Sequence, residues 1–370
     1  MSFLSVFEQH TWEGMAERIN GKQAADVERA LDKPGKRDLD DFCALISPAA
    51  TPYLERMAQL SYRLTRKRFG NTTQLYIPMY LSNECHNICT YCGFSVDNKL
   101  KRRTLTREQV LQEVEAIKAH RFEHLLMVTG EAHRTVGVDY LEQALEWVRP
   151  HFSSLSLEVQ ALDQADYERL IKKGLDSVLL YQETYHRDNY RQYHPKGKKR
   201  NFEYRLETPD RLGRAGIHRI GLGALLGLED WRTDAAFVAL HLGYLERRYW
   251  QTKYSISLPR LRPAEGVQSP NVVVTDRDFV QMICAYRIYS ENVEISLSTR
   301  ERPEFRDHLL KLGITSMSAG SKTEPGGYAI EEEALEQFEI SDDRSVDEVV
   351  AMIRRQGFDP VWKDWDSVLG

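Results

Sequence analysis

From residue 71 onward, short hydrophobic runs alternate with longer amphipathic stretches. Runs of roughly four to eight apolar or β-branched residues are typical of buried parallel strands, because such strands are covered on both faces. Most of the intervening stretches space their apolar residues three and four apart, which predicts helices, and one opens with Thr106 and Gln109 in capping-box spacing. Eight strand-like runs are present, at residues 75–81, 124–130, 154–160, 177–183, 219–226, 254–259, 293–299 and 314–319.

Strands that alternate with helices predict right-handed crossovers and therefore a parallel sheet. Eight strand–helix units are what a closed (β/α)8 TIM barrel requires, and its usual size of about 250 residues fits residues 71–321. An open, doubly wound sheet is the alternative, but eight strands favour closure. We therefore predict an α/β fold built on a (β/α)8 barrel.

The two ends of the chain differ from this alternating region. Residues 1–70 show helical spacing, with Gly35 and Gly70 where helix C-caps belong, so we expect an N-terminal helical extension. Residues 322–370 begin turn-rich and acidic, which predicts a short C-terminal extension packed on the barrel, with one helix near residues 345–356.

Polar segments follow six of the eight predicted strands. In a parallel barrel the active site forms where the carboxyl ends of the strands meet, so these segments are predicted to share one rim. They read, in chain order, SNECHNICTYC, TGE, QETYH, PRLRP, STRE and SAGSKTEPGGY.

Composition narrows the class of protein. Of 370 residues, 42% are hydrophobic and 28% charged, and the formal net charge is −5, which gives no global reason to expect a nucleic-acid or membrane-surface partner. The hydrophobic runs are far shorter than the roughly 20 residues that span a bilayer, and the N-terminus lacks a basic region and cleavage site. We expect a cytoplasmic protein.

The five cysteines fall into two groups. Cys43 and Cys284 lie in apolar, helix-like surroundings and are expected to be core residues, and an odd, sparse set argues for a reducing compartment rather than a disulfide framework. Cys85, Cys89 and Cys92 have the spacing C-x3-C-x2-C inside one loop. This spacing predicts a metal site.

Two kinds of metal centre are compatible with three clustered thiols. A structural zinc site usually needs four protein ligands, and no second cysteine pair or histidine knuckle is present; His86 lies next to Cys85 and would have to fold back on it. Three thiolates suit a cubane [4Fe–4S] cluster, and they leave one iron without a protein ligand. The iron without a protein ligand can bind a small-molecule ligand.

The cysteine spacing, the aromatic Tyr91 before the last cysteine and the position after the first barrel strand resemble the radical S-adenosylmethionine (SAM) superfamily. The resemblance implies one cluster held by the three cysteines. It also implies that SAM chelates the open iron, and that an electron from an external reductant, through the cluster, cleaves SAM to a 5′-deoxyadenosyl radical.

The resemblance also implies contacts to SAM. The segment Thr129-Gly130-Glu131 resembles the element that receives the methionyl amino group, although a simple turn is the alternative. Three further elements resemble contacts to the ribose, the methionine carboxylate and the adenine: Glu183, Arg205 and the strand containing Gly221 and Gly223. For an arginine on a helix, such as Arg205, a solvated position is the alternative.

Longer stretches resemble the aromatic amino-acid lyases of this superfamily over nearly the whole chain, among them ISLPRLRPAEG, SAGSKTEPGGY and the ending VWKDWDSVLG. The tyrosine lyases of thiamin biosynthesis fit better than those of hydrogenase maturation, which carry a second cluster, because no cysteine follows Cys284. The implied reaction splits the Cα–Cβ bond of L-tyrosine to 2-iminoacetate (dehydroglycine) and p-cresol. A tryptophan lyase, a transferase making a deazaflavin precursor and a non-catalytic zinc-binding scaffold remain as alternatives.

Substrate contacts follow from the same resemblance. A guanidinium binds a carboxylate bidentately, and the resemblance places the arginine for the tyrosine carboxylate at Arg300, although a salt bridge with Glu301 or Glu304 is the alternative. Ser318 and Ser321 follow the last predicted strand and are expected to hydrogen-bond the carboxylate or the amine.

Three expectations concern protons, electrons and product. A base for the tyrosine phenol could be His133, His186 or Glu131. The basic segments 99–103 and 196–200 could dock a flavodoxin-type donor that passes electrons from NADPH, or simply be solvated. Because 2-iminoacetate hydrolyses quickly in water, a complex with thiazole synthase is expected.

Overall fold

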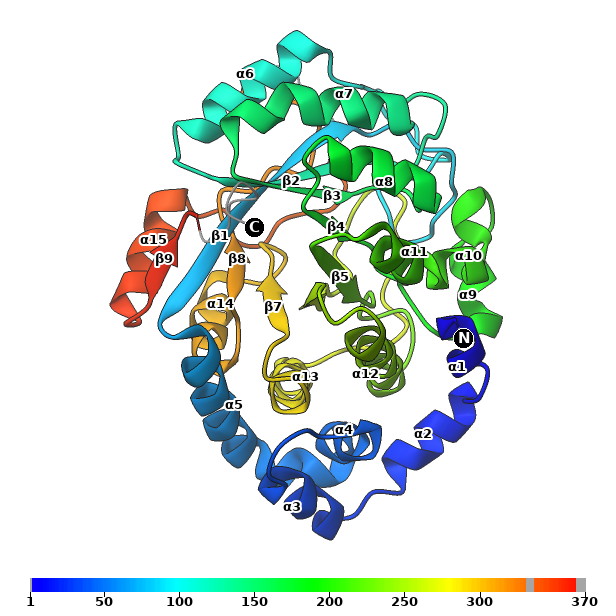
Figure 1. The fold of residues 1–370 in the computed structure, drawn as a ribbon, viewed down its shortest axis with the longest axis vertical. Helices are drawn as coiled ribbons and strands as arrows, with labels where there is room; N and C mark the ends of the chain where they lie inside the picture. The colour runs from blue at the N-terminus through cyan, green and yellow to red at the C-terminus, as the bar shows by residue number, and fades with distance from the viewer. Residues whose placement is uncertain (1, 331–335, 364–370) are drawn as a thin grey trace.

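A computed structural model describes residues 2–330 and 336–363 of the chain. Eight parallel strands close into a barrel, because β1 pairs with both β8 and β2 (Figure 1). The predicted TIM barrel is therefore confirmed, and the open-sheet alternative is wrong. The strands are β1 (Thr72–Ser82), β2 (His124–Thr129), β3 (Ser154–Glu158), β4 (Ser177–Leu179), β5 (Arg219–Gly223), β6 (Lys253–Ser257), β7 (Glu294–Leu297) and β8 (Ser316–Ser318).

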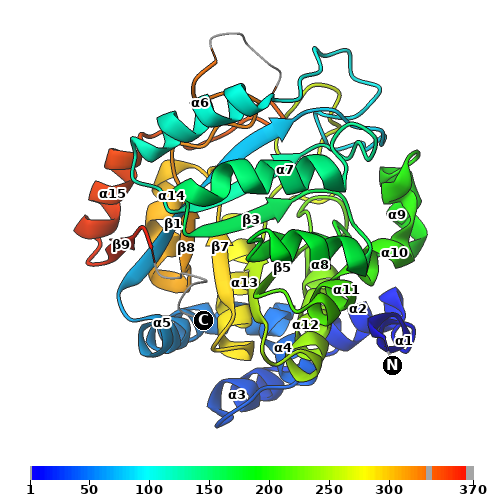
Figure 2. The ribbon, with the colours of Figure 1, turned by 45° about the horizontal axis from the view of Figure 1, so that its top comes forward.

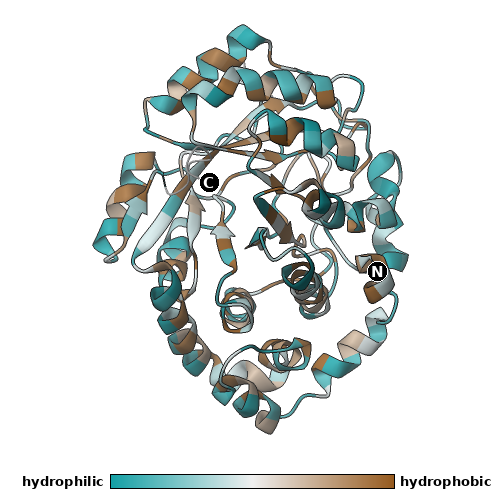
Figure 3. Cartoon of the chain, in the orientation of Figure 1, coloured by the Kyte–Doolittle hydropathy of each residue, from teal (hydrophilic) through white to brown (hydrophobic). Residues whose placement is uncertain are grey.

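The helices of the barrel surround the strands (Figure 2). The capping box predicted at Thr106 and Gln109 is present at the start of α6. Most of these helices carry hydrophobic residues along one side and hydrophilic residues along the other (Figure 3), whereas α12 and α13 are buried nearly all round because the N-terminal helices also cover them. They are α6 (Arg107–Lys118), α7 (Val138–Val148), α8 (Gln164–Lys172), α9 (Arg187–Tyr193), α10 (Phe202–Leu206), α11 (Thr208–Ala215), α12 (Trp231–Arg248), α13 (Asp276–Tyr289) and α14 (Pro303–Leu309).

The strands alternate between an apolar outer face and a more polar inner face. Outward residues such as Ile77, Leu157 and Ile256 are fully buried in the main hydrophobic core under the helices. Inside the lower barrel, Arg219 and Glu294 form an ion pair at 3.0 Å. This polar layer closes the lower part of the barrel interior, so a ligand has access from the other end, where the strands finish.

Helices fill the N-terminal region, as predicted, and form a second layer over α12 and α13 (Figure 1). Gly70 is the C-cap of α5, with φ of +63°. The expectation for Gly35 is wrong, since α3 ends at Asp32 with Lys33 as its C-cap. The helices are α1 (Phe3–Phe7), α2 (Trp12–Asn20), α3 (Ala24–Asp32), α4 (Leu39–Ile46) and α5 (Leu54–Phe69).

The C-terminal region contains the predicted helix, α15 (Val346–Arg355), and a ninth strand that was not predicted. That strand, β9 (Asp359–Val361), pairs in parallel with the start of β1. The last seven residues of the ending VWKDWDSVLG lie outside the described residues. The division of the chain at residues 70/71 and 321/322 stays a prediction. No helix in the described parts of the chain is long and apolar enough to cross a membrane.

Candidate active site

A cavity opens at the carboxyl ends of the barrel strands, where the polar segments were predicted to meet. Its lining includes twelve of the fourteen predicted site residues: Cys85, Cys89, Tyr91, Cys92, Thr129, Gly130, Glu131, Glu183, Arg205, Arg300, Ser318 and Ser321. Gly221 and Gly223 are not among the lining residues. A Cβ on Gly221 would lie 2.7 Å from the Leu179 side chain, and one on Gly223 2.4 Å from the Ser257 carbonyl oxygen, so both glycines permit close strand packing.

The cysteine loop leaves the end of β1 and is held by buried polar contacts. Asn83 donates from Nδ2 to the carbonyl of Lys101 and accepts at Oδ1 from the backbone of Arg103, at 3.0 and 2.6 Å. The guanidinium of Arg102 donates to the carbonyls of Phe94 and Ser95 at 2.9 and 2.7 Å. Part of the basic segment 99–103 therefore braces the loop, which neither earlier interpretation of that segment anticipated.

The three loop cysteines lie on one wall of the cavity. Burial raises the pKa of the Cys85 thiol to about 11 and raises the pKa of Cys89 and Cys92 as well, so thiolates here need a metal to stabilise them. His86 is exposed. Among the described residues, no three Cys, His, Asp or Glu side chains converge as closely as one metal ion requires. In a cubane cluster each thiolate binds a different iron, so its ligands lie further apart, and the three thiols fit that group.

Four charged side chains form a buried cluster beside the cysteines. Arg205 Nη1 lies 3.0 Å from Glu131 Oε1, Arg205 Nη2 lies 3.5 Å from Glu183 Oε1, and Lys199 Nζ lies 2.7 Å from the same Glu183 oxygen. Asn87 Nδ2 also donates to Glu131 at 2.8 Å. The cluster has two cations and two anions, so its formal charges balance.

The backbone at this cluster is constrained. Glu183 has φ of +72°, a left-handed conformation that non-glycine residues seldom adopt and that concentrates at functional sites. Its carbonyl accepts from Leu225 N at 2.8 Å. A Cβ on Gly130 would lie 2.3 Å from the Glu84 carbonyl oxygen, so only glycine fits between Thr129 and Glu131.

Lys199 was not predicted as a site residue. Residues 196–200 were interpreted as a docking or solvated segment, and Lys196, Lys198 and Arg200 are indeed exposed. The Lys199 side chain, by contrast, is only 11% exposed, and its pKa is raised because the nearby carboxylates outweigh the effect of burial. No local sequence signal marks Lys199; in the structure, Gly197, with a left-handed φ of +96°, turns the segment toward Asn87.

Arg300 faces the cavity and makes no ion pair within the described parts of the chain. Its Cζ lies 3.4 Å from the centre of the Phe338 ring, and Nη1 donates to the Arg260 carbonyl at 3.4 Å. Glu301 pairs with Arg260 instead, and Glu304 is exposed, so neither expected salt bridge forms. Burial lowers the pKa of Arg300, which shows that its charge lacks full compensation.

The two serines at the end of the last barrel strand, Ser318 as the final residue of β8 and Ser321 three residues further on, differ in their contacts. Ser318 Oγ accepts from the backbone of Thr299 at 3.2 Å. Ser321 Oγ is buried and has no partner among the described residues, although it belongs to the cavity lining. An orphaned buried hydroxyl costs free energy until a ligand satisfies it. Ser321 is therefore the better placed of the two to contact a ligand.

The histidines proposed as phenol bases do not reach the cavity. His133 lines a separate groove, and His186 caps α9 by accepting from Asn189 N at 3.1 Å while packing on Trp12. Sequence reasoning instead missed Glu158, the last residue of β3, which lines the cavity. The sequence did contain a signal for Glu158, because a carboxylate inside a predicted buried strand is unusual.

Comparisons with known proteins agree with this geometry. The model of the Radical SAM superfamily matches residues 79–237, and that of the Biotin and Thiamin Synthesis associated domain matches residues 257–359. The barrel, its cysteine loop and these matches define a radical SAM enzyme.

Particular relatives narrow the family. The chain is 53% identical to a 2-iminoacetate synthase of Escherichia coli (strain K12), over 100% of this chain and 98% of that protein. It therefore belongs to the 2-iminoacetate synthase family. Among solved structures it resembles the FeFe-hydrogenase maturase HydG from Carboxydothermus hydrogenoformans, with a TM-score of 0.89 and 30% identity over 95% of this chain and 84% of that one. Methylornithine synthase, at 18% identity and a TM-score of 0.74, shares the fold.

Proposed function

We propose that the protein is a 2-iminoacetate synthase. It cleaves the Cα–Cβ bond of L-tyrosine to 2-iminoacetate and p-cresol, with methionine and 5′-deoxyadenosine as further products, and supplies 2-iminoacetate for the thiazole of thiamin. The observation that carries this proposal is the 53% identity to the curated enzyme over the whole chain.

Cys85, Cys89 and Cys92 would hold a [4Fe–4S] cluster whose fourth iron accepts SAM. Together, the bound cluster and SAM supply the 5′-deoxyadenosyl radical that removes a hydrogen from the amino group of tyrosine. The loop orients these groups, because Arg102 and Asn83 anchor it to its own backbone. The protein's contribution is positioning and exclusion of water, since the cofactors carry the difficult chemistry.

The buried charge cluster is the proposed SAM site. Glu131 receives the methionyl amino group, Arg205 pairs with the methionine carboxylate, and Glu183 accepts from the ribose. Lys199 is added to this set because it holds Glu183 at 2.7 Å. In the ligand-free protein these groups pair with one another. When SAM binds, its charged groups replace these partners, so no buried charge is left unpaired. Gly221 and Gly223 do not line the cavity, so their proposed contribution to adenine binding is indirect, through the close packing of β5 against Leu179 and Ser257.

Arg300, Ser318 and Ser321 are the proposed contacts to the substrate carboxylate. Phe338 packs against the Arg300 guanidinium, whose Cζ lies 3.4 Å from the ring centre, and restricts its orientation. Orientation matters because the radical removes whichever hydrogen is nearest, and a displacement of about 1 Å can cost on the order of 10²-fold in rate.

Product analysis of an anaerobic turnover tests the function. The protein is reconstituted with iron and sulfide and supplied with SAM, a reductant and L-tyrosine. We expect p-cresol, and glyoxylate from hydrolysis of 2-iminoacetate, in equal amounts. L-Tryptophan in place of tyrosine is the control and should give neither. Formation of 5′-deoxyadenosine from tyrosine without p-cresol would reject the lyase.

Two partners extend the proposal. A flavodoxin reduced by NADPH is the proposed electron donor, and thiazole synthase is the proposed acceptor of 2-iminoacetate, which water would otherwise destroy. Affinity purification of the protein from cells that express both enzymes should recover thiazole synthase. Direct transfer should reduce the release of glyoxylate when excess thiazole synthase is present. Equal release with and without thiazole synthase would argue against direct transfer.

A further inference from the structure

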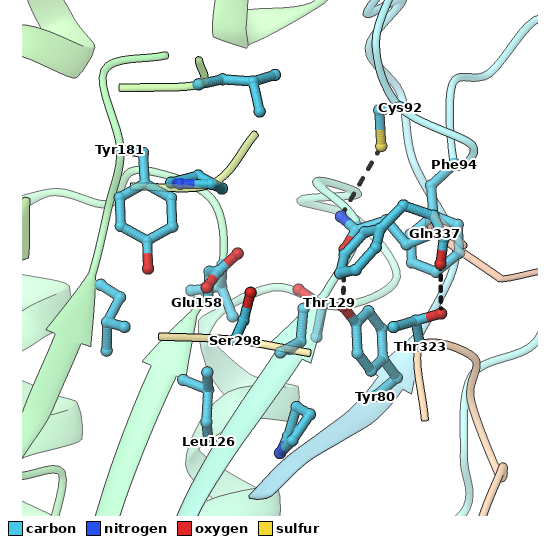
Figure 4. Close-up of a pocket in the computed structure, with 18 of the residues that line it drawn as sticks. Tyr80, Cys92, Phe94, Leu126, Thr129, Glu158, Tyr181, Ser298, Thr323 and Gln337 are labelled. Carbon is cyan, nitrogen blue, oxygen red and sulfur yellow. Dashed lines mark hydrogen bonds between the residues drawn. The ribbon is translucent and has the colours of Figure 1, made fainter. Parts of the chain in front are cut away.

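One carboxylate in the cavity has no partner. Among the described residues, three glutamates contribute to the lining, and two of them, Glu131 and Glu183, are held by Arg205 and Lys199. The Glu158 side chain forms no hydrogen bond or ion pair with any residue in the described parts of the chain, although it faces the cavity (Figure 4). A partly buried carboxylate without a partner is costly, so its presence in the cavity calls for a ligand or a proton.

Glu158 lies across the cavity from the proposed carboxylate site. It ends β3, whereas Arg300 follows β7, and strands four apart in an eight-stranded barrel form opposite walls. The inward residues Leu126 and Leu179 lie beside Glu158 and also border the polar layer below. The Glu158 end of the cavity is therefore an apolar, aromatic-lined region suited to a phenol ring.

A tyrosine that spans this cavity can contact both Arg300 and Glu158 in only one orientation. Its carboxylate and amine share one carbon, so both stay near Arg300 and the two serines. The phenol oxygen is the polar atom at the far end of tyrosine, and it would lie beside the β3 wall. There the sole acidic or basic side chain in the described cavity lining is Glu158.

We propose that Glu158 accepts the proton of the tyrosine phenol. This role rests on the proposed tyrosine lyase activity. The phenolic O–H bond breaks, a carboxyl O–H bond forms on Glu158, and the electron pair stays on the phenol oxygen, so no oxidant or reductant is needed. The resulting phenolate makes loss of the side chain easier, because its charge delocalises into the departing ring.

The surroundings fit a proton acceptor near neutral pH. Burial raises the pKa of Glu158 to about 7, which suits a base that must be ionised before substrate binds and protonated afterwards. The positive charge of Arg300 is the main charge that favours the ionised form of Glu158. When the substrate carboxylate neutralises Arg300, Glu158 loses this effect and its proton affinity rises further. The charged and titratable groups that act on Glu158 are Arg300, Glu183, Lys199, Arg205, Tyr76, Tyr80 and Tyr181.

The test compares wild-type enzyme with Glu158→Gln, which keeps the shape and removes the base. We expect p-cresol formation from tyrosine to fall about 10²-fold and the acidic limb of the wild-type pH–rate profile, near pH 7, to disappear. A fluorinated tyrosine has a more acidic phenol, while its amine is little changed. Glu158→Gln should therefore turn over fluorinated tyrosine at least about tenfold faster than it turns over tyrosine. Glu158→Asp, which keeps a carboxylate, should retain a pH-dependent activity.

The outcomes separate the two proposals. Glu304→Gln, on an exposed glutamate, is the control and should match wild type. No p-cresol from wild-type enzyme would overturn the lyase function itself. Normal wild-type turnover with an unchanged pH profile in Glu158→Gln, or a defect that fluorinated tyrosine does not relieve, would overturn the role of Glu158 alone.

Discussion

The side-chain amide of Gln337 donates to Cys92 Sγ at 3.8 Å (Figure 4). Its oxygen accepts from the Tyr80 hydroxyl at 2.7 Å, and its backbone carbonyl accepts from Gly93 N at 3.1 Å. The segment that carries Gln337 also places Phe338 on Arg300. A piece of the C-terminal region thus contacts a proposed cluster ligand, the barrel wall and the proposed substrate arginine together.

Gln337→Leu should lower the reduction potential of the cluster. Hydrogen bonds to ligating sulfur stabilise the reduced, more negative cluster, so their loss shifts the potential downward, here on the order of tens of millivolts. Redox titration followed by electron paramagnetic resonance measures the shift. Gln112→Leu, on the exposed face of α6, is the matched control. Equal potentials in both variants would contradict the role of the amide.

Replacing any of Cys85, Cys89 or Cys92 by Ala should abolish the iron–sulfur absorption and p-cresol formation. Each thiolate binds a different iron, so two cannot hold the cluster in place of three. Cys43→Ala and Cys284→Ala are the controls. Both residues are fully buried, with thiol pKa values raised to about 12 by burial, and the variants should keep the cluster while losing about 1 kcal/mol of stability.

Arg300→Lys should weaken tyrosine binding even though the charge is kept. An ammonium cannot form the bidentate pair, and it packs less well against Phe338, so we expect KM for tyrosine to rise at least about tenfold, or roughly 1.4 kcal/mol. Steady-state kinetics measure the change. Arg302→Lys, on a half-exposed neighbour paired with Asp276, should leave KM unaltered. An unaltered KM in Arg300→Lys would remove Arg300 from the substrate site.

Lys199→Met should weaken SAM binding, whereas Lys198→Met should not. Lys199 holds Glu183 inside the cavity, while Lys198 is exposed one residue away. Without the ammonium, Glu183 keeps only the longer contact to Arg205, and we expect the Kd for SAM to rise about tenfold. Equilibrium binding to the reconstituted protein tests this. Equal effects of the two substitutions would instead support a general electrostatic role for the segment.

Glu158 should make the stability of the ligand-free protein depend on pH. Burial raises its pKa from 4.5 to about 7, so between these values the folded protein binds more protons than the unfolded chain, and the free energy of unfolding falls as pH rises. The loss is at most about 3 kcal/mol. Denaturant unfolding at about pH 5 and about pH 8 should show Glu158→Gln gaining relative to wild type at the higher pH. A constant difference would contradict this.

Local patterns were sufficient for most of the fold. All eight barrel strands were predicted because buried parallel strands appear in the sequence as continuous apolar runs. The helices between them space their apolar residues three and four apart, which distinguishes them from the strands. The ninth strand was missed because Asp359–Val361 has only three residues and contains a proline, and it becomes a strand through pairing with β1. The end of α3 was misplaced because Gly35 adopts its left-handed conformation two residues beyond the cap.

The candidate site divides in the same way. The cysteines and Glu131 were predicted from short motifs that follow a strand, and Arg205 from a family resemblance on a helix; the structure places all of them in the cavity lining. Lys199 looked like one lysine in a basic run, and nothing local marks it as the one that turns inward. Gln337 lies 245 residues from Cys92, so no sequence pattern could join them.

The sequence by itself determined the barrel, the cluster loop and the family, because these depend on periodicity and on residues a few positions apart. Only the tertiary structure decided which charges are paired and which are not. Within the described parts of the chain, Arg300 and Glu158 have no ion-pair partner and lie on opposite walls of the cavity, whereas Lys199 pairs with Glu183. Pairing depends on distances across the barrel, which closure of the strands sets and which the order of residues along the chain does not reveal.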